Sequence, residues 1–186
     1  MANDFQFFLI TPFLLMLMRL NKTLAYLLNI LLILLSVMAS MLILYHYNIR
    51  LPNGGSDLTD NYYNKPYCRL AAYMVGVLLA QLYYDRKLAK KGLSAASKTC
   101  GNFVFSCYER SAFFSWGSAL LGVCITTFLI FFYKDAFDQG PWSVGASMVW
   151  TAISRPLFVF GMMLVLLPTF EGRLPWLRSF ISCGLF

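Results

Sequence analysis

The feature that most constrains this chain is a run of 24 residues, Leu24 to Tyr47, without a single Asp, Glu, Lys or Arg. As a helix this run is about 36 Å long, at roughly 1.5 Å per residue, and therefore exceeds the roughly 30 Å hydrocarbon layer of a bilayer. Lipid offers backbone amides no hydrogen-bond partner, so such a segment crosses it as a helix. We therefore predict an all-α integral membrane protein.

Composition agrees with a membrane protein and excludes several other classes. The 186 residues are 59% hydrophobic and only 12% charged, against roughly 25% charged in soluble domains. The net charge of +7 does not predict nucleic-acid binding, because the cations lie in loops between apolar segments and not on one face of a soluble module. One His, and five Cys without a CxxC pair, predict no metal site. The expected partners are the lipid bilayer and other membrane subunits.

Five apolar segments predict a multi-pass bundle of about five transmembrane helices, with residues 1–186 forming one transmembrane helical domain. The first and third segments are shorter than the roughly 20 residues of a straight span. We expect each of them either to include flanking polar residues in its helix or to be surrounded by protein. The five segments are Phe5 to Leu20, Leu24 to Tyr47, Leu70 to Tyr84, Ser111 to Tyr133 and Trp142 to Pro168.

The distribution of Lys and Arg predicts the orientation of the bundle. Ten cations lie on one side of the predicted spans and four on the other, so the side with ten should face the cytoplasm or its equivalent. The N-terminus and the loop from Asn48 to Pro66 are then outside. The inner loop from Asp85 to Arg110 begins as a basic continuation of the third helix and ends in an aromatic stretch. Which membrane holds the protein is not indicated.

Arg155 is the most informative single residue because it lies near the centre of the last predicted span. A cation at this depth costs roughly 2.5 to 3.5 kcal/mol on insertion scales. Pro156 follows it and predicts a kink, with the guanidinium facing the interior of the bundle. Arg155 is then either an anion site for a phosphate, a carboxylate or an acyl donor, or a structural cation paired inside the bundle.

Two further pairs of polar residues lie at the predicted outer interface. Asp4 and Gln6 precede the first span and are interpreted as either helix-capping residues or the rim of a polar cavity. Lys65 and Arg69 flank Pro66, a helix-start signal, and could meet a headgroup or an anionic substrate. The sequence contains no Gly-rich phosphate loop, no Ser/His/Asp set and no carboxylate pair, so residue patterns alone predict no catalytic site.

Three segments together resemble the membrane acyltransferase-3 family, in particular its nose-resistant-to-fluoxetine-like branch. The first, "ANDFQFFLITP", matches the family pattern at Ala2, Asn3, Asp4, Gln6, Phe7 and Pro12. The second, "KPYCRLAAYMVGVLLA", matches the family pattern at Lys65, Pro66, Arg69, Tyr73 and Gly76 and departs from it at Ala72 and Ala80. The third, "SRPLFVFG", matches at Ser154, Arg155 and Gly161, with Phe158 where the family has Trp.

The resemblance implies that this chain is part of a larger fold of about ten helices that transfers acyl groups from a cytoplasmic donor, such as acyl-coenzyme A, to a sugar or lipid. It assigns Asp4 and Gln6 to the wall of the acceptor cavity and Arg155 to an anionic or carbonyl group. Lys65 and Arg69 would shape the outer entrance. The family helix that carries the catalytic His has no match here, so no catalytic residue and no enzyme activity is assigned to this chain alone.

Two alternatives to acyl transfer stay open. The first is a catalytically inactive accessory subunit of a larger membrane assembly. The second is a module for lipid or drug uptake without chemistry, since members of the same branch are associated with transport.

Overall fold

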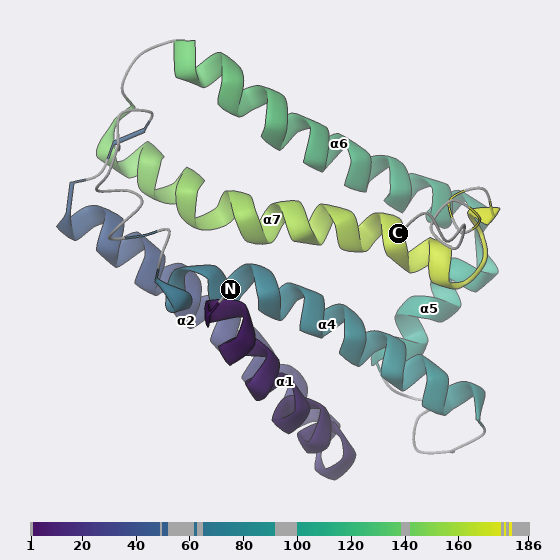
Figure 1. The fold of residues 1–186 in the computed structure, drawn as a ribbon. Coiled ribbons are helices and arrows are strands. Elements are labelled where there is room, and N and C mark those ends of the chain that lie inside the picture. The colour runs from purple at the N-terminus through teal and green to yellow at the C-terminus, as the bar shows by residue number, and fades with distance from the viewer. Residues whose placement is uncertain are drawn as a thin grey trace. The chain divides into compact units, whose positions relative to one another are not determined.

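The computed structural model describes residues 2–48, 50–51, 62, 65–91, 100–138, 142–175, 177 and 179. This part of the chain is helical and contains no β-strand, which confirms the predicted all-α class for it. Its helices in chain order are α1 (Ala2–Leu20), α2 (Lys22–His46), α4 (Pro66–Lys90), α5 (Cys100–Arg110), α6 (Ala112–Asp138) and α7 (Val144–Phe170) (Figure 1).

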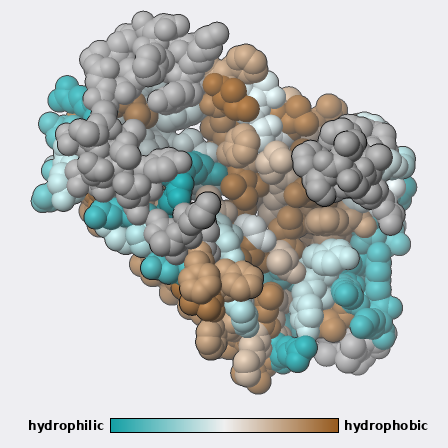
Figure 2. Space-filling view, in the orientation of Figure 1, coloured by the Kyte–Doolittle hydropathy of each residue, from teal (hydrophilic) through white to brown (hydrophobic). Residues whose placement is uncertain are grey.

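Three of the described helices are long and apolar enough to cross a membrane: α2, residues Ala112–Phe132 of α6, and α7. Phe5–Leu20 of α1 is apolar but shorter. α4 has the necessary length, but its charged residues, Arg69 near one end and Asp85 to Lys90 at the other, leave only residues 70–84 uncharged. The prediction of a membrane protein is thus supported by three helices, and not by all five of the predicted spans. Hydrophobic side chains cover much of the face drawn in Figure 2, as expected where lipid is the solvent.

The helix ends follow local sequence signals. Asn21 is extended, and its Oδ1 accepts a hydrogen bond from the Leu24 amide at 3.2 Å, which caps the N-terminus of α2. α4 begins at Pro66, as the proline predicts, since its missing N–H would have no partner in a first turn. α1 and α4 both include polar residues beyond the predicted spans, as expected for segments of their length.

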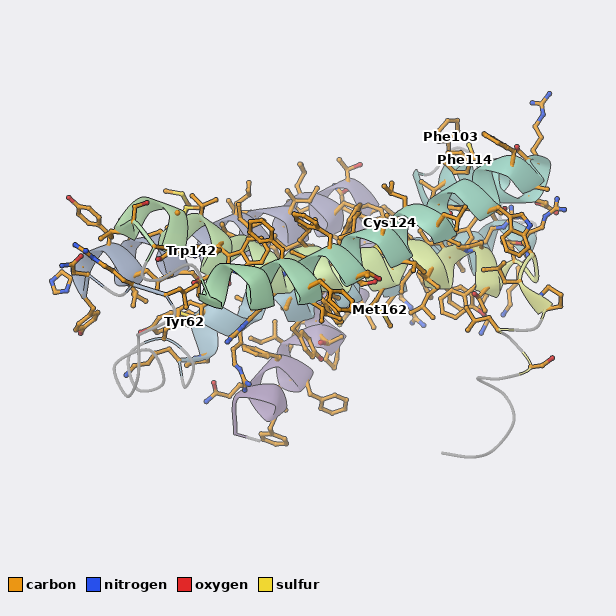
Figure 3. The ribbon with its side chains drawn as sticks, turned by 90° about the horizontal axis from the view of Figure 1, so that it is seen from above. Tyr62, Phe103, Phe114, Cys124, Trp142 and Met162 are labelled. Carbon is orange, nitrogen blue, oxygen red and sulfur yellow. The ribbon has the colours of Figure 1, made fainter. Side chains whose placement is uncertain are left out.

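α5 is a helix where the sequence predicts the end of the inner loop. Phe105 and Tyr108 are buried, whereas Phe103 is 70% exposed and is labelled with the exposed Phe114 in Figure 3. Aromatic residues therefore lie on both the buried and the exposed face of this short helix. A helix of 11 residues is marginal on its own, so tertiary contacts must stabilise it.

The chain divides into two compact units. Unit 1 comprises Met1–Leu78 and Phe128–Val159, and unit 2 comprises Leu79–Thr127 and Phe160–Phe186. The core of unit 1 has two clusters of buried side chains. One contains Leu14, Met74 and Val77, and the other contains Leu44, Tyr62 and Cys68.

Ser36 joins α2 to α4 within unit 1. Its hydroxyl donates to the Tyr67 carbonyl at 2.5 Å and accepts from the Ala71 amide at 2.9 Å. These two backbone groups are four residues apart and form one turn of α4. The 2% exposed serine therefore makes the kind of interhelical hydrogen bond expected where polar side chains lie inside apolar helices.

In unit 2, α6 and α7 approach closely at two glycines. A Cβ atom on Gly122 would lie 2.5 Å from the Gly161 carbonyl oxygen, closer than real Cβ atoms come to backbone. A Cβ on Gly161 would likewise lie 3.1 Å from the Gly122 carbonyl oxygen. Small residues permit this backbone contact, which is a common basis of helix association in membranes.

Candidate functional site: a cavity with two arginines

Unit 1 contains a cavity of about 820 Å³ whose lining comes from α1, α4, α6 and α7 and from Leu51. This volume is within the roughly 300 to 1,000 Å³ typical of small-molecule sites. Most of the lining is apolar or aromatic, and it includes two guanidinium groups. The lining residues are Phe7, Leu51, Arg69, Ala72, Tyr73, Leu129, Ile130, Trp150, Thr151, Ser154, Arg155, Phe158 and Val159.

Arg155 reaches the cavity from α7 and is half-buried. Its guanidinium carbon lies 5.0 Å from the centroid of the Tyr62 ring, a distance at which the negative face of the ring attracts the cation. Such a contact is worth up to about 2 kcal/mol when water is excluded. It offsets part of the cost of placing a cation at this depth and keeps the guanidinium next to the cavity.

Tyr62 is 1% exposed and is anchored at its other end. Its hydroxyl donates to the Thr151 carbonyl oxygen of α7 at 2.9 Å. Burial raises the pKa of Tyr62, although the positive charge of Arg155 acts in the opposite direction. The phenol therefore stays neutral at physiological pH and keeps the proton that this hydrogen bond requires.

Leu51 is tied to the start of α7 and contributes to the same wall. Its carbonyl accepts from the Trp142 amide at 2.8 Å, and its amide donates to Ser147 Oγ at 3.1 Å. Both backbone groups of this 5% exposed leucine are thus satisfied, as buried backbone requires.

The first helix and α4 form an aromatic wall. The rings of Phe7 and Tyr73 lie 5.3 Å apart, and the Tyr73 hydroxyl is 2.9 Å from Thr11 Oγ1. Thr11 in turn donates to the Phe7 carbonyl at 2.9 Å. These contacts hold Phe7, Thr11 and Tyr73 in place relative to one another, and Phe7 and Tyr73 line the cavity.

The structure brings together two of the predicted site residues. Arg69 and Arg155 both line the cavity, although they are 86 positions apart in the sequence. Gln6 is exposed and Lys65 is half-buried, and neither is among the lining residues. The side chain of Asp4 lies outside the described residues, so its predicted role stays a prediction.

Sequence reasoning did not identify Tyr62 and Thr151 as part of this site. Thr151 precedes Arg155 by four residues, and that spacing places two helical residues on one face, so it was a usable signal. Tyr62 had no such signal because it lies in the segment between α2 and α4, where no periodicity relates it to α7.

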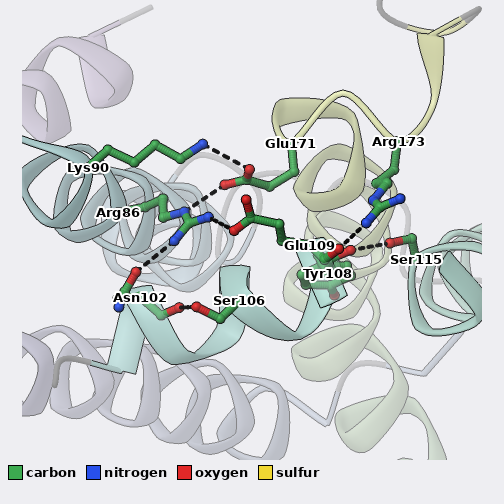
Figure 4. Close-up of polar contacts among 9 residues, drawn as sticks. All are labelled: Arg86, Lys90, Asn102, Ser106, Tyr108, Glu109, Ser115, Glu171 and Arg173. Atoms are coloured by element: carbon green, nitrogen blue, oxygen red, sulfur yellow. Dashed lines mark hydrogen bonds and ion pairs between the residues drawn. The ribbon is translucent and has the colours of Figure 1, made fainter. Parts of the chain in front are cut away.

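A second polar cluster lies in unit 2 and centres on Arg86 (Figure 4). Arg86 Nε donates to Glu171 Oε1 at 2.8 Å, Nη1 donates to Asn102 Oδ1 at 2.8 Å, and Nη2 is paired with Glu109. Lys90 Nζ also donates to Glu171, at 2.9 Å. From the sequence, Arg86 is one of the ten cations on the predicted inner side, with no signal that sets it apart.

Charge pairing sets the protonation of this cluster. Burial raises the pKa of Glu171, but the hydrogen bonds from Arg86 and Lys90 outweigh burial and hold that pKa below its usual range. Glu171 follows α7 directly, and Gly172 then takes a φ of 75°, which glycine adopts without strain at a helix C-terminus. Each of the three guanidinium nitrogens of Arg86 has an acceptor within the protein, so we assign this cluster a structural role.

The arginines that line the unit 1 cavity are chemically suited to an anion or a polarised carbonyl. Two guanidinium groups offer planar sets of donors, which suit carboxylate and phosphate oxygens. Among the described residues, no group of three or more His, Cys, Asp or Glu side chains is placed to hold a metal ion.

Comparisons of the chain with protein-family models, with curated proteins and with solved structures found no match. The likeness to acyltransferases thus depends on the three sequence segments. Each segment contributes to the lining of the cavity: Phe7 from the first, Arg69 and Tyr73 from the second, and Arg155 from the third.

Proposed function

We propose that this chain is part of an integral membrane protein that transfers acyl groups, and that the unit 1 cavity holds a substrate. In this proposal α1 and α4 cross the bilayer together with α2, α6 and α7, within a larger acyltransferase-3-like fold. The observation that carries the proposal is the convergence of Arg69 and Arg155 on one cavity. Segments that are far apart in the sequence but resemble one family supply its walls.

Arg155 would hold an anionic or carbonyl group of the substrate, with the Tyr62 ring fixing its guanidinium at 5.0 Å. A positioned cation stabilises the negative charge that develops on a carbonyl oxygen during acyl transfer. Arg69 would add a second cation. The donor is proposed to be acyl-coenzyme A, reaching the bundle from the side with ten cations, and the acceptor a sugar or lipid.

The test is acyl transfer by the protein in its native membrane complex, measured with labelled acyl-coenzyme A and membrane lipids or sugars as acceptors. We expect Arg155→Gln to lower the rate by about 10²- to 10³-fold, the usual effect of losing one group that stabilises an oxyanion. Lys87→Gln, which removes an exposed cation from α4 outside the cavity, is the matched control and should leave the rate unchanged. Absence of transfer by the wild-type complex would contradict the proposal.

A second candidate is a catalytically inactive accessory subunit. It is favoured by the small share of each candidate span that is buried within the chain, 22% for α2, 28% for α6 and 22% for α7. Neighbouring proteins could cover these faces as well as lipid could. Crosslinking in the native membrane distinguishes the two functions, because a subunit should crosslink to the same few proteins along several spans.

A further inference from the structure

α5 and the first turns of α6 expose large aromatic rings. Phe103 of α5 is 70% exposed, and Phe113, Phe114 and Trp116 of α6 are 90%, 49% and 50% exposed. Figure 3 shows Phe103 and Phe114 on the outside of this end of the chain. Four exposed rings within 14 consecutive residues form an apolar surface of the kind that contacts a partner or a membrane.

The connection to α6 determines where α5 lies relative to a membrane. α5 ends at Arg110, and after the single residue Ser111 α6 begins at Ala112. Ala112 is also the first residue of the candidate span Ala112–Phe132, so it lies close to the boundary between hydrocarbon and water. A helix of 11 residues is only about 16 Å long at roughly 1.5 Å per residue. All of α5 therefore lies within that distance of the membrane surface.

Contacts within unit 2 hold α5 against α4 and prevent it from turning away. A Cβ on Gly101 would lie 2.6 Å from the Leu82 carbonyl oxygen of α4, so the two backbones are in contact. The Phe105 ring lies 6.4 Å from the Tyr83 ring, and Arg86 binds two side chains of α5. These contacts use the buried face of α5 and leave the opposite face to the surroundings.

The corner between α5 and α6 is also fixed. The Tyr108 ring lies 5.0 Å from the Phe114 ring, and Ser115 Oγ donates to the Tyr108 carbonyl at 3.0 Å. The exposed rings of the two helices therefore keep one arrangement relative to each other and form one surface.

Unit 2 also carries most of the positive charge of the chain. It contains eight Lys and Arg against three Asp and Glu, a net charge of +5 out of the total of +7. Two of its acids, Glu109 and Glu171, are paired with cations of the same unit. Exposed cations lie at the ends of the two helices that meet here: Lys91 directly after α4 and Arg110 at the end of α5.

Exposed rings next to cations match the interface of an anionic bilayer. Aromatic side chains insert at the level of the headgroups, and Lys and Arg bind anionic headgroups there. A neutral leaflet would cover the rings but would leave the excess positive charge of unit 2 without compensation.

We infer that α5 is a membrane-surface helix that binds anionic phospholipids of the leaflet at which α6 begins. The rings of Phe103 and Phe113 lie in the interface, and Lys91 and Arg110 contact the headgroups. The inference goes beyond the proposed function, because it holds whether or not the chain transfers acyl groups.

Photocrosslinking from position 103 tests this directly. Phe103→p-benzoylphenylalanine places a photoreactive ring on the exposed face of α5, where replacement leaves the buried face intact. The full chain is reconstituted in phosphatidylcholine vesicles with a minor fraction of phosphatidylserine and illuminated. Mass spectrometry then identifies the molecule attached and the carbon to which it is attached. The same variant is illuminated in its native membrane.

We expect phospholipid adducts at position 103, on the glycerol or on acyl carbons near it. The depth control is Leu121→p-benzoylphenylalanine, because Leu121 is 55% exposed and lies near the middle of the span Ala112–Phe132. Its adducts should lie toward the methyl ends of the chains. Absence of lipid adducts at position 103, or adducts there with another protein in the native membrane, would overturn the inference.

The composition of the adducts tests the preference for anionic lipid. We expect the share of phosphatidylserine among the adducts at position 103 to exceed its share of the bilayer several-fold. One cation near the surface raises the local share of anionic lipid by up to about fivefold, which corresponds to about 1 kcal/mol. Arg110→Gln should therefore lower the enrichment, and Lys91→Gln with Arg110→Gln should lower it further.

Arg50→Gln, which removes an exposed cation of unit 1, is the matched control and should keep the full enrichment at position 103. Adducts that contain phosphatidylserine only in proportion to the bilayer would overturn the assignment of an anionic partner. An enrichment that Lys91→Gln with Arg110→Gln leaves unchanged would overturn it as well.

Discussion

Arg86 and Glu171 are joined by a hydrogen-bonded ion pair with a distance of 2.8 Å between Nε and Oε1, although 85 residues separate them. Their side chains are only 9% and 6% exposed. The pair connects the C-terminal part of α4 to the residue that follows α7, within unit 2. Because both charges are withdrawn from water, each depends on the other for compensation.

Replacing Glu171 with Gln should destabilise unit 2 by roughly 1.5 to 3 kcal/mol, because Arg86 would lose a buried charged hydrogen-bond partner while it keeps its pairing with Glu109. The measurement is denaturant unfolding in detergent micelles. Lys90→Gln is the matched control, since it removes a partner of the same carboxylate whose side chain is 54% exposed, and it should cost about 1 kcal/mol or less. Equal losses of unfolding free energy in the two variants would show that burial of the Arg86–Glu171 pair does not increase its contribution to stability.

The same pair predicts an acid-sensitive stability. The pKa of Glu171 is lower in the folded protein than the roughly 4.3 of an unfolded chain, so the stabilisation is complete above that unfolded value and is lost as pH falls through the folded one. Thermal unfolding followed from about pH 7 to about pH 3 should show a decline below about pH 5. The decline should be smaller in Glu171→Gln, and an unchanged decline would assign the acid sensitivity to other groups.

Gly122→Ala should separate α6 from α7 in unit 2, because its Cβ would lie 2.5 Å from the Gly161 carbonyl and backbone must move to relieve the clash. Gly117→Ala on the same helix is the control. A Cβ at Gly117 meets nothing within 4 Å, so this variant should gain up to about 1 kcal/mol from helix propensity. Opposite signs of the two changes in unfolding free energy are the expected result.

Ser36→Ala should destabilise the contact between α2 and α4 in unit 1. Its hydroxyl makes two hydrogen bonds to the backbone of α4, each worth about 0.5 to 1.5 kcal/mol. Ser106→Ala removes a hydroxyl that donates to the Asn102 carbonyl of its own helix and should cost less. Unfolding in the same detergent compares them, and a smaller loss for Ser36→Ala would contradict this account.

The helical class and most helix positions followed from the sequence. Long apolar runs permit only helices in lipid, and Asn21 and Pro66 mark helix starts through backbone chemistry that is local to each site. α5 was not predicted, although its buried residues Gly101, Phe105 and Tyr108 follow the i, i+4, i+7 spacing of a helix. Its 11 residues are too few to be stable alone and depend on burial within unit 2. Whether α1 and α4 cross the membrane stays a prediction, because their sequences combine apolar and polar residues.

The candidate site was predictable in its charges and not in its geometry. Arg155 stood out because a cation inside an apolar span is costly, and Arg69 because it follows a helix start at the outer interface. Gln6 and Lys65 had similar signals, yet the structure does not place them in the lining of the cavity. The side chain of a polar residue at a helix end has many low-energy orientations. Its residue type and its place in the sequence therefore do not determine whether it lines a cavity.

The sequence by itself predicted a membrane environment, the helices that lipid requires and the energetic cost of a cation at Arg155. Only the tertiary structure decided that Arg69, Arg155 and Thr151 share one cavity and that Tyr62 lies beside the guanidinium at 5.0 Å. The physical reason is that helix formation depends on neighbours within about four residues, whereas a site depends on packing between segments that no local rule relates.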